Sequence, residues 1–332
     1  MNKWYSGEGN NSDVVMSSRI RLARNLEDTP FPGRMSRDIR KNTVKKIFAA
    51  IKNSPFAGDF DLIDLSSMSE AQAVSYAEKL LISPEFAKDR ENASFLLSKD
   101  ESVSIMLCEE DHIRLSAMEA GQNLAAAYAR ANELDDVFIK NLKIAFDEKL
   151  GFLTSVPTNL GTGMKASFDL HLPAIKQRDM IGQLSVTVGK LGLSLRPLFG
   201  SNGAFYRLSN QVTLGITEQS AIDNMNAICD QIVKQERNLR EMLANREEFE
   251  DKVYRAMGTL LMARKLSTAE FFELLSLVRV GISMGYCEKS YKDIGELIQT
   301  VQTATVIAAS DADITADTAA KIRAGLVREK LK

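Results

Sequence analysis

The stretch that decides the fold is VVMSSRIRLAR, residues 14–24. In its second half, Arg19 and Arg21 alternate with Ile20 and Leu22. Successive side chains of a strand point to opposite faces, so the two arginines share one face and the two apolar residues share the other. This stretch therefore predicts a β-strand with an apolar face toward a core and a cationic face on the opposite side.

Three further segments repeat this alternation. They are VSIMLCEEDHIRL (103–115), MKASFDLHL (164–172) and LSLR (193–196). The polar face of these strands is expected to carry Glu110, His112 and Arg114, then Lys165, Ser167, Asp169 and His171, and finally Ser194 and Arg196. Strands with one apolar and one polar face are typical of an antiparallel sheet that is covered by helices on one side.

The kind of polar residue is unusual for a solvated face, because arginine recurs beside carboxylates. A guanidinium is the preferred bidentate partner of phosphate oxygens. If residues 103–115 form one strand, Glu110 and Arg114 lie roughly 13 Å apart along it and point the same way. The arginine then holds a nucleotide phosphate while the carboxylate faces an acceptor, as phosphoryl transfer requires. The alternative is a cross-strand salt-bridge network, which contributes little on a surface.

Composition narrows the function classes. The chain has 332 residues, 45% of them hydrophobic and 26% charged, with a formal net charge of −2. These values are typical of a globular chain and predict no attraction to nucleic acid or to a membrane surface. Three scattered cysteines and two histidines predict neither a disulfide framework nor a metal centre built from protein ligands. The N-terminus lacks an apolar segment, so a cytoplasmic location is expected.

Helical periodicity predicts helices over residues 38–53, 70–81 and 119–134. From 217 to about 266 the pattern is almost continuously helical, with a break expected near Ala244 and Asn245. Ser267 and Glu270 then form a capping-box pattern. Strand-like alternation ends near residue 215. We therefore expect an α+β fold, with an antiparallel sheet flanked by helices in a catalytic domain (1–245) and a small all-helical C-terminal domain (246–332).

One loop adds weaker support. TNLGTG (158–163) precedes the Lys165 strand, and its backbone amides could approach an anion, although short Gly/Thr loops are more often plain turns. It matches neither the GxxxxGK[ST] phosphate loop nor a dinucleotide-binding turn. The loops of the common protein kinases are also missing from the sequence.

Five segments together are similar to a known family. They are SSRIRLARN (17–25), EEDHIRL (109–115), FDEKLGFLTSVPTNLGTGMKAS (146–167), LSNQVTLG (208–215) and VYRAMGTLLMARKLS (253–267). In this order they resemble the ATP:guanido phosphotransferases, and within that superfamily the bacterial protein-arginine kinases. The resemblance covers essentially the whole chain. It implies the guanido kinase catalytic-domain fold and the ATP-dependent phosphorylation of arginine residues in proteins, with Mg²⁺, in bacterial protein quality control.

The resemblance also implies roles for single residues. Glu110 resembles the catalytic carboxylate that orients and deprotonates the guanidinium. Ser167 and Asp169 stand where the family contacts adenine. The residues that the resemblance places on the nucleotide phosphates are Arg19, Arg21, Arg114, Lys165 and Arg196. The family holds Mg²⁺ mainly through the nucleotide and water, so no protein metal ligand is expected.

The sequence departs from the family at several of these positions. Lys165 replaces an arginine, which keeps the charge but loses the bidentate fork. Val156 replaces a cysteine, and Cys108 stands where Asn or Ser is common. The family's flexible loop after Arg196 carries a second glutamate, whereas this chain has a shorter stretch with no acidic residue before Glu218. A second carboxylate helps to hold the nucleophile, so its loss predicts reduced activity.

The C-terminal region departs as well. Ala319 and Ala320 stand where the protein-arginine kinases carry an Arg-Asp pair that recognises phosphoarginine. Arg323 and Arg328 remain nearby, but basic residues late in a helix more often complement the helix dipole. The apolar segment 271–286 fits either a core or a dimer interface, of which core is the simpler alternative.

Three functions are compatible with these observations. The first is a protein-arginine kinase whose partners are protein substrates bearing arginine, an activating adaptor, Clp-type protease machinery and a second copy in a homodimer. The second is a nucleotide-binding, catalytically weakened regulator of the same fold. The third is a small-guanidine kinase, against which the absence of the large N-terminal helical domain counts.

Overall fold

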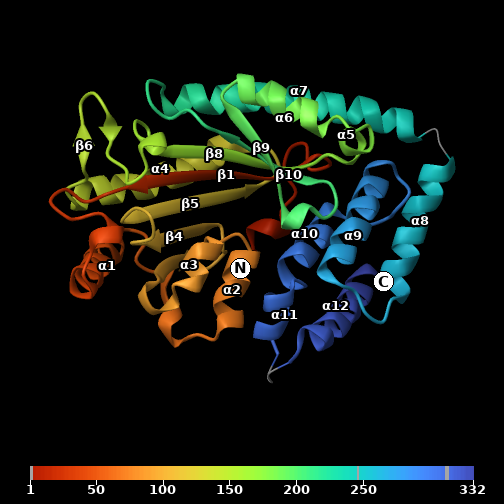
Figure 1. Ribbon diagram of the computed structural model, residues 1–332, viewed down its shortest axis with the longest axis horizontal. Helices are drawn as coiled ribbons and strands as arrows, with labels where there is room; N and C mark the ends of the chain where they lie inside the picture. Colours follow the sequence, from red (N-terminus) through yellow and green to blue (C-terminus); the bar gives the residue numbers. More distant parts are fainter. Residues whose placement is uncertain (1–2, 245–246, 311–313) are drawn as a thin grey trace.

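The computed structural model describes residues 3–244, 247–310 and 314–332. Figure 1 shows one broad sheet with helices above it and a group of helices at its right-hand end. The expected domain boundary at residues 245 and 246 lies outside the described residues. The helices on either side of it are α7 (Glu218–Ala244) and α8 (Glu247–Met262).

The sheet has eight strands, and every pairing in it is antiparallel. In spatial order the strands are β2 (Phe60–Asp64), β3 (Ser94–Ser98), β4 (Val103–Leu107), β5 (Ile113–Ala120), β1 (Val15–Arg24), β8 (Met164–His171), β10 (Phe205–Asn210) and β9 (Leu193–Pro197). Strand β1, which the sequence singled out, is therefore central, with β5 on one side and β8 on the other. A separate two-stranded ribbon pairs β6 (Phe146–Asp147) with β7 (Gly151–Phe152).

Helices cover the apolar face of the sheet. Contacts join α4 (Leu124–Asn141) to β1 and β5, α7 to β8, and α6 (Ile181–Lys190) to β9. The core between these layers includes Ile20, Leu22 and Phe168, all at most 1% exposed. Alternation on β1 and β8 thus sends the apolar side chains to this core and leaves the polar side chains on the other face. The helix α1 (Arg37–Lys52) packs on α4, and α5 (Pro173–Gln177) packs on α7.

The polar face is partly covered at one end. There α2 (Glu70–Glu78) and α3 (Pro84–Lys88) pack on β3 and β4 through a small core that includes Phe95 and Met106. Met106 is the cross-strand partner of Arg114, so these helices lie on the same side of the sheet as the polar residues. They border the central part of that face.

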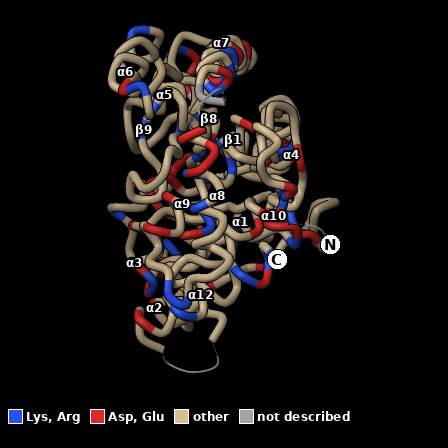
Figure 2. The backbone as a smooth tube through the Cα atoms, turned by 90° about the vertical axis from the view of Figure 1, so that its right-hand side faces the viewer, with Lys and Arg blue, Asp and Glu red and all other residues tan. Residues whose placement is uncertain are grey.

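The C-terminal helices build a core of their own from α8, α9 (Thr268–Ser283), α10 (Tyr291–Thr300), α11 (Thr303–Ala308) and α12 (Ala316–Leu331). In α9, Phe271, Phe272 and Leu275 are fully buried within this single chain. The segment 271–286 is therefore mainly core. In Figure 2 the basic and acidic residues of this side are interspersed, in keeping with the small net charge.

The two groups of elements are joined by polar as well as apolar contacts. Glu78 at the end of α2 accepts hydrogen bonds from the backbone N–H groups of Ala304 (2.9 Å) and Thr305 (2.7 Å) at the start of α11. His171 at the end of β8 lies 2.8 Å from the hydroxyl of Ser276 on α9. A carboxylate at a helix N-terminus and a buried side-chain hydrogen bond both fix the C-terminal helices against the sheet.

The structure corrects two sequence-based expectations. Residues 103–115 are not one strand, because β4 ends at Leu107 and a turn over residues 108–112 leads into β5. Cys108 begins this turn with φ = 56°, a left-handed conformation that ends the strand. The helix expected over 119–134 instead spans Leu124–Asn141, because Asn123 caps it through a hydrogen bond from the Ala126 N–H (3.3 Å).

The other helix expectations agree with the structure within a few residues. Ser36 and Ser69 cap α1 and α2. Ser267 caps α9 by accepting a hydrogen bond from the Glu270 N–H (3.1 Å). No strand of the described residues lies beyond Asn210.

Candidate functional site

Cationic side chains lie next to one another across the polar face of the four strands β1, β8, β10 and β9. Arg21 pairs directly with Lys165, and Arg207 pairs directly with Arg196. Arg19 lies one row away, opposite Ser167. Directly opposed residues of antiparallel strands share a face with Cβ atoms about 4.5–5.5 Å apart. The register alone therefore gathers these cations.

These side chains line one cavity, which we call the arginine cradle. Its five cationic residues are Arg19, Arg21, Lys165, Arg196 and Arg207. Among the described residues that line the cavity there is no Asp or Glu. The remaining lining is mostly polar and includes Thr158, Ser194, Ser209 and Asn210. A concave surface lined by five cations and by no carboxylate among its described residues fits a polyanion.

Two cradle arginines lack partners of their own. The Nε atoms of Arg19 and Arg21 are buried and have no hydrogen-bond partner in the described part of the chain. Burial, with repulsion from Arg114 and Arg207, lowers the pKa of Arg21 to about 9. Burial, with repulsion from Arg207 and Arg21, lowers the pKa of Arg19 well below its ordinary value. A bound anion would relieve both effects.

Arg207 is a site residue that the sequence-based prediction missed. Its Nε and Nη2 donate to the two carboxylate oxygens of Asp169, at 2.6 and 2.8 Å, and Ser17 Oγ donates to the same carboxylate at 3.2 Å. Burial would raise the pKa of Asp169, but Arg207 and Arg19 lower it below its ordinary value. The carboxylate is thus held ionised, and it fixes Arg207 at the edge of the cradle.

A sequence signal for Arg207 existed. Residues 205–210 read FYRLSN, in which Tyr206 and Leu208 alternate with Arg207 and Ser209. This is the same alternation that identified β1. The prediction of a loop over residues 197–208 took precedence over this alternation.

Arg114, on β5, lies beside the cradle and is held by a carboxylate. Its Nη1 forms an ion pair with Glu109, which also accepts a 2.7 Å hydrogen bond from Ser83 Oγ. Burial would raise the pKa of Glu109, but Arg114 and Ser83 lower it. Glu109 was not among the expected site residues. It fixes the Arg114 side chain in place.

Glu110 lies in the turn between β4 and β5, and not on a strand as expected. It lines a second cavity, the acceptor cavity, together with Arg21, Arg114, Lys165 and Asn159. Burial, with repulsion from Asp111 and Glu109, raises the pKa of Glu110 above its ordinary value despite attraction from Arg114. A carboxylate with a raised pKa next to a cationic cavity is suited to accept a proton.

The turn that presents Glu110 is held by buried hydrogen bonds. Asn25 Nδ2 donates to Asp111 Oδ1 at 2.6 Å, and the His112 N–H donates to Asn25 Oδ1 at 2.9 Å. His112 Nδ1 accepts from the Leu26 N–H, while its Nε2 lies 2.9 Å from the Pro30 carbonyl. His112 therefore supports the turn and does not share a strand face with Glu110 and Arg114, as had been expected.

The remaining expected nucleotide contacts have definite positions. Ser167 is 2% exposed, and its hydroxyl has no partner in the described residues. Lys165 lines both the cradle and the acceptor cavity, and burial with repulsion from Arg21 and Arg196 lowers its pKa. Asp169 lies at the far end of β8, where it pairs with Arg207.

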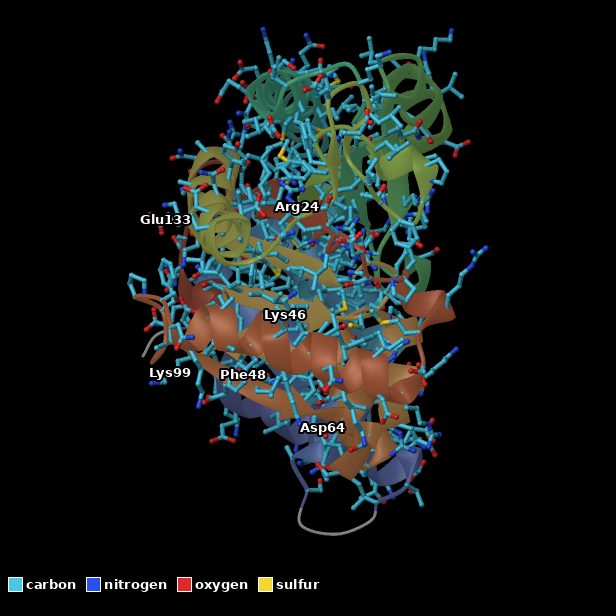
Figure 3. All side chains as sticks on the ribbon, turned by 90° about the vertical axis from the view of Figure 1, so that its left-hand side faces the viewer. Arg24, Lys46, Phe48, Asp64, Lys99 and Glu133 are labelled. Atoms are coloured by element: carbon cyan, nitrogen blue, oxygen red, sulfur yellow. The ribbon has the colours of Figure 1, made fainter. Side chains whose placement is uncertain are left out.

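Not every arginine of β1 faces the cradle. Arg24, labelled in Figure 3, is 2% exposed and donates to both oxygens of Asp135, with Nε 3.0 Å from Oδ1 and Nη2 2.7 Å from Oδ2. Its guanidinium also lies 3.5 Å from the ring centroid of Phe152. Arg24 is fully engaged in the fold, in contrast to Arg21 on the same strand.

The stretch after Arg196, expected to be a flexible loop, is a short connection packed on the C-terminal helices. Phe199 stacks on Phe272 of α9 with ring centroids 4.3 Å apart and an interplanar angle of 8°. Leu198 and Phe205 belong to the C-terminal core. Gly203 has φ = 70°, and a Cβ there would lie 2.7 Å from the Phe272 carbonyl oxygen, so this close approach requires glycine.

Other departures from the family pattern also have clear positions. Val156 lines the acceptor cavity. Ala319 and Ala320 are buried, at 0% and 6% exposed. Arg323 donates to the Val301 and Leu266 carbonyls and to the Thr303 hydroxyl, so its guanidinium is used within the C-terminal core.

The described residues contain neither a candidate metal-binding cluster nor a candidate membrane-spanning helix. No group of three or more His, Cys, Asp or Glu side chains there could hold a metal ion. None of the helices in these residues is long and apolar enough to cross a membrane.

Two known protein families match this chain, one over each part of it. The ATP:guanido phosphotransferase C-terminal catalytic domain matches residues 42–239, and the protein-arginine kinase McsB C-terminal domain matches residues 246–332. The chain belongs to the ATP:guanido phosphotransferases. A protein-arginine kinase of Clostridium tetani is 38% identical to this guanido phosphotransferase over 339 residues, covering 100% of this chain and 99% of the relative. One from Geobacillus stearothermophilus is 38% identical over 338 residues and covers 99% and 93%.

Solved structures agree with the fold. A duplicated taurocyamine kinase from Schistosoma mansoni, with bound transition-state analogue components, aligns with a TM-score of 0.64 at 23% identity. The alignment covers 77% of this guanido phosphotransferase and 40% of that chain. A lombricine kinase aligns with a TM-score of 0.58 at 20% identity, covering 70% and 69%. The antiparallel sheet flanked by helices is thus the guanido kinase fold, as expected from the sequence.

Proposed function

We propose that this chain is a protein-arginine kinase that transfers the γ-phosphoryl group of ATP to arginine side chains of proteins. The observation that carries the proposal is the arginine cradle, which has five cations, no carboxylate among its described lining residues, and a turn carrying Glu110 beside it. Full-length relatives named protein-arginine kinase support the choice of acceptor. We propose the division into a catalytic domain (1–245) and a helical domain (246–332) on the same grounds.

Each cationic residue of the polar face is proposed to contact a different part of the bound nucleotide. The triphosphate lies on Arg19, Arg21 and Lys165, with Arg196 and Arg207 at the edge and Arg114 near the transferred group. Their charges neutralise the phosphate oxygens in the ground state and in the transition state. Because every one of these side chains except Arg114 lines a single cavity, the protein provides this charge before the nucleotide arrives.

Glu110 acts on the acceptor. The guanidinium of the substrate enters the acceptor cavity, and Glu110 takes a proton from one of its nitrogens. A nitrogen–phosphorus bond forms as the bond between the γ-phosphorus and the β,γ-bridging oxygen breaks, and ADP leaves. In-line positioning and charge neutralisation supply most of the acceleration, and a general base typically contributes a factor of about 10²–10⁴.

Mg²⁺ enters this proposal with the nucleotide. Mg²⁺ at nucleotide sites is commonly held by substrate phosphates and water, with few protein ligands. When bound, Mg²⁺ neutralises part of the phosphate charge. The protein groups nearest to that charge are the cradle cations.

The remaining parts of the proposal follow from the family. Protein substrates bearing arginine are the proposed partners, with an activating adaptor and Clp-type protease machinery in cytoplasmic protein quality control. Homodimerisation is a further proposal. Ser167 and Asp169 are proposed to lie at the nucleoside end of the bound ATP.

A second candidate is a nucleotide-binding regulator with weak or no transfer activity. The observation that favours it is the connection after Arg196, which has no acidic residue before Glu218 and is packed on α9 through Phe199. A packed connection cannot close over the acceptor and brings no second carboxylate to it. The guanidinium would then depend on Glu110 alone.

One experiment separates the two candidates. The purified chain is incubated with labelled Mg-ATP and an arginine-rich protein, and acid-labile phosphate on the protein is measured against Glu110→Gln. A kinase gives transfer that Glu110→Gln lowers by about 10²–10⁴. Transfer equal to that of the variant, with ATP still bound, supports the regulator. Labelling of free arginine but not of protein would contradict the protein substrate.

A further inference from the structure

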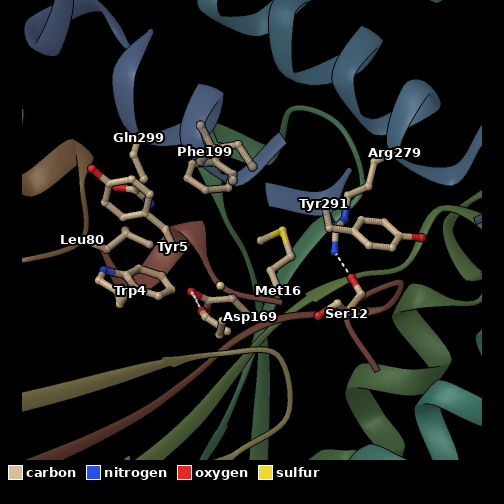
Figure 4. A pocket seen from close by; sticks show the side chains of 15 residues that line it. Trp4, Tyr5, Ser12, Met16, Leu80, Asp169, Phe199, Arg279, Tyr291 and Gln299 are labelled. Carbon is tan, nitrogen blue, oxygen red and sulfur yellow. Dashed lines mark hydrogen bonds between the residues drawn. The ribbon is translucent and has the colours of Figure 1, made fainter. Parts of the chain in front are cut away.

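A further cavity lies between the sheet and the C-terminal helices, and we call it the interdomain pocket (Figure 4). Trp4 of the N-terminal segment lines one side of it. Ser17 and Asp169 come from the ends of β1 and β8, and Arg279 and Gln299 come from α9 and α10. Three parts of the chain that are far apart in sequence therefore meet around one small space.

The interdomain pocket continues the polar face that carries the cradle. Ser17 pairs with Asp169 one row beyond the pair of Arg19 and Ser167. Rows of the same face are two residues apart, roughly 6–7 Å along the strand. A phosphate chain that runs from the Arg21 row to the Arg19 row thus points toward this pocket. Asp169 also connects the two cavities, because it lines the pocket and holds Arg207 of the cradle.

A neighbouring cavity gives the same connection on the side of α2 and α3. It is lined by Arg19, Arg114 and Arg207 together with Leu80 and other apolar residues of 77–82. Leu80 also lines the interdomain pocket. Leu80 thus lines both cavities, so the cavity that contains the cradle arginines Arg19 and Arg207 lies next to the interdomain pocket.

Two buried polar groups in the interdomain pocket lack partners. Gln299 is 5% exposed, and its Oε1 has no hydrogen-bond partner in the described residues. Arg279 is 3% exposed, and its Nε also has none, although its Nη2 donates to the Ser12 carbonyl. A buried acceptor or donor without a partner is destabilising, so native proteins rarely retain one without a reason.

The walls of the pocket suit a flat, largely apolar group. They include the rings of Trp4, Tyr5, Phe199 and Tyr291. Arg279 is itself stacked, with its guanidinium carbon 4.6 Å from the ring centroid of Tyr291. A heteroaromatic base offers ring faces to such walls and hydrogen-bonding edges to a side-chain amide.

The free volume of the pocket is about 50 Å³, so a base needs additional room. The side chain of Met16 points into the middle of the pocket (Figure 4). Methionine is unbranched and has three rotatable side-chain bonds, so it can adopt another rotamer and leave room in the pocket. A base that entered the pocket would therefore displace the Met16 side chain.

We propose that the C-terminal helices form the far wall of the nucleotide site, with Gln299 hydrogen-bonded to the edge of the nucleobase. This inference rests on the proposed function, in that the cradle binds the triphosphate. It assigns to α9 and α10 a part in nucleotide binding, so that a bound nucleotide contacts both the sheet and the C-terminal domain. The base, and not the phosphates, contacts the C-terminal domain.

Binding of two ligands by three proteins tests the proposal. The wild type, Gln299→Leu and the control Thr300→Val are titrated with Mg-ATP and with inorganic tripolyphosphate at one salt concentration. Thr300 lies on the same helix but is exposed, and its hydroxyl donates to the Glu296 carbonyl outside the pocket. Gln299→Leu loses one neutral hydrogen bond to the base, so it binds ATP about 3- to 10-fold more weakly than the wild type does. Its affinity for tripolyphosphate is unchanged. Thr300→Val binds both ligands as the wild type does.

A second measurement uses the wild type alone and does not depend on how the variant folds. Amide hydrogen exchange over residues 291–300 slows when ATP binds and does not slow when tripolyphosphate binds. Equal ATP affinity in Gln299→Leu and the wild type, or equal protection of this helix by both ligands, would overturn the inference and leave the cradle intact. Failure of the wild type to bind either ligand would overturn the proposed function and this inference together.

Discussion

Arg21 and Arg24 lie on the same strand and give opposite predictions when each is replaced by methionine. The charge of Arg21 is disfavoured in the folded state, because burial with repulsion from Arg114 and Arg207 lowers its pKa from 12.5 to about 9. At 1.36 kcal/mol per pKa unit this shift corresponds to roughly 5 kcal/mol. The destabilisation is present at every pH below about 9 and is relieved as the pH rises through that value.

The full figure is an upper limit, since the Arg21 side chain is partly exposed and water screens its charge. Replacement of a buried ion pair by well-packed apolar side chains is neutral or stabilises by up to about 1–4 kcal/mol, and we take this as the scale for a buried arginine. We therefore expect Arg21→Met to raise the free energy of unfolding by an amount in that range when no nucleotide is present. It should also weaken ATP binding about 10- to 150-fold, because a hydrogen bond to a charged group contributes about 1.5–3 kcal/mol.

Arg24→Met is the matched control. It removes the partner of Asp135, whose side chain is 6% exposed, and leaves a buried carboxylate without its ion pair. Such a loss typically destabilises by about 3–5 kcal/mol. The assay is urea unfolding of the wild type and both variants, with and without Mg-ATP. A lower stability of nucleotide-free Arg21→Met would refute the claim that the cradle is an electrostatically strained anion site.

Three further predictions follow from other parts of the site. Glu110 must be ionised to accept a proton, and its pKa is raised above the ordinary value of 4.5. As the pH is lowered, kcat/KM for transfer should therefore fall with a midpoint above pH 4.5. A midpoint at or below pH 4.5 would contradict this prediction. Asp169→Asn should lower the free energy of unfolding by about 3 kcal/mol, because Arg207 loses its ion pair. Added tripolyphosphate should restore part of the lost stability. Unchanged thermal unfolding of the variant would argue against the ion pair. Phe272→Ala should destabilise by about 3–5 kcal/mol and speed amide exchange over residues 197–204; unchanged exchange there would mean that α9 does not hold this connection.

Much of the site could be predicted from the sequence because it lies on strands. A period of two residues places Arg19 and Arg21 on one face without any knowledge of their neighbours. The same rule places Lys165 and Arg196 on polar faces, and the observed register brings all four together. The fold class could be predicted for the same reason, since each strand is apolar on one side only.

The other features of the site could not be predicted from the periodicity of the sequence. Glu110 was expected on a strand because its segment continues the alternation, whereas a single left-handed residue, Cys108, turns the chain there. The packing of Phe199 on Phe272 depends on a contact between residues far apart in sequence. Arg207 was missed although its strand alternates in the same way, because its neighbourhood was expected to be a flexible loop.

The binding of Mg-ATP to the cradle tests the central claim most directly. Isothermal titration compares the wild type with Arg19→Met and Arg21→Met at one salt concentration, after equal folding has been checked by circular dichroism. The account predicts one ATP site in the wild type and an affinity at least about 10-fold weaker in each variant. Equal affinity in the wild type and both variants would show that ATP binds elsewhere and would contradict the account.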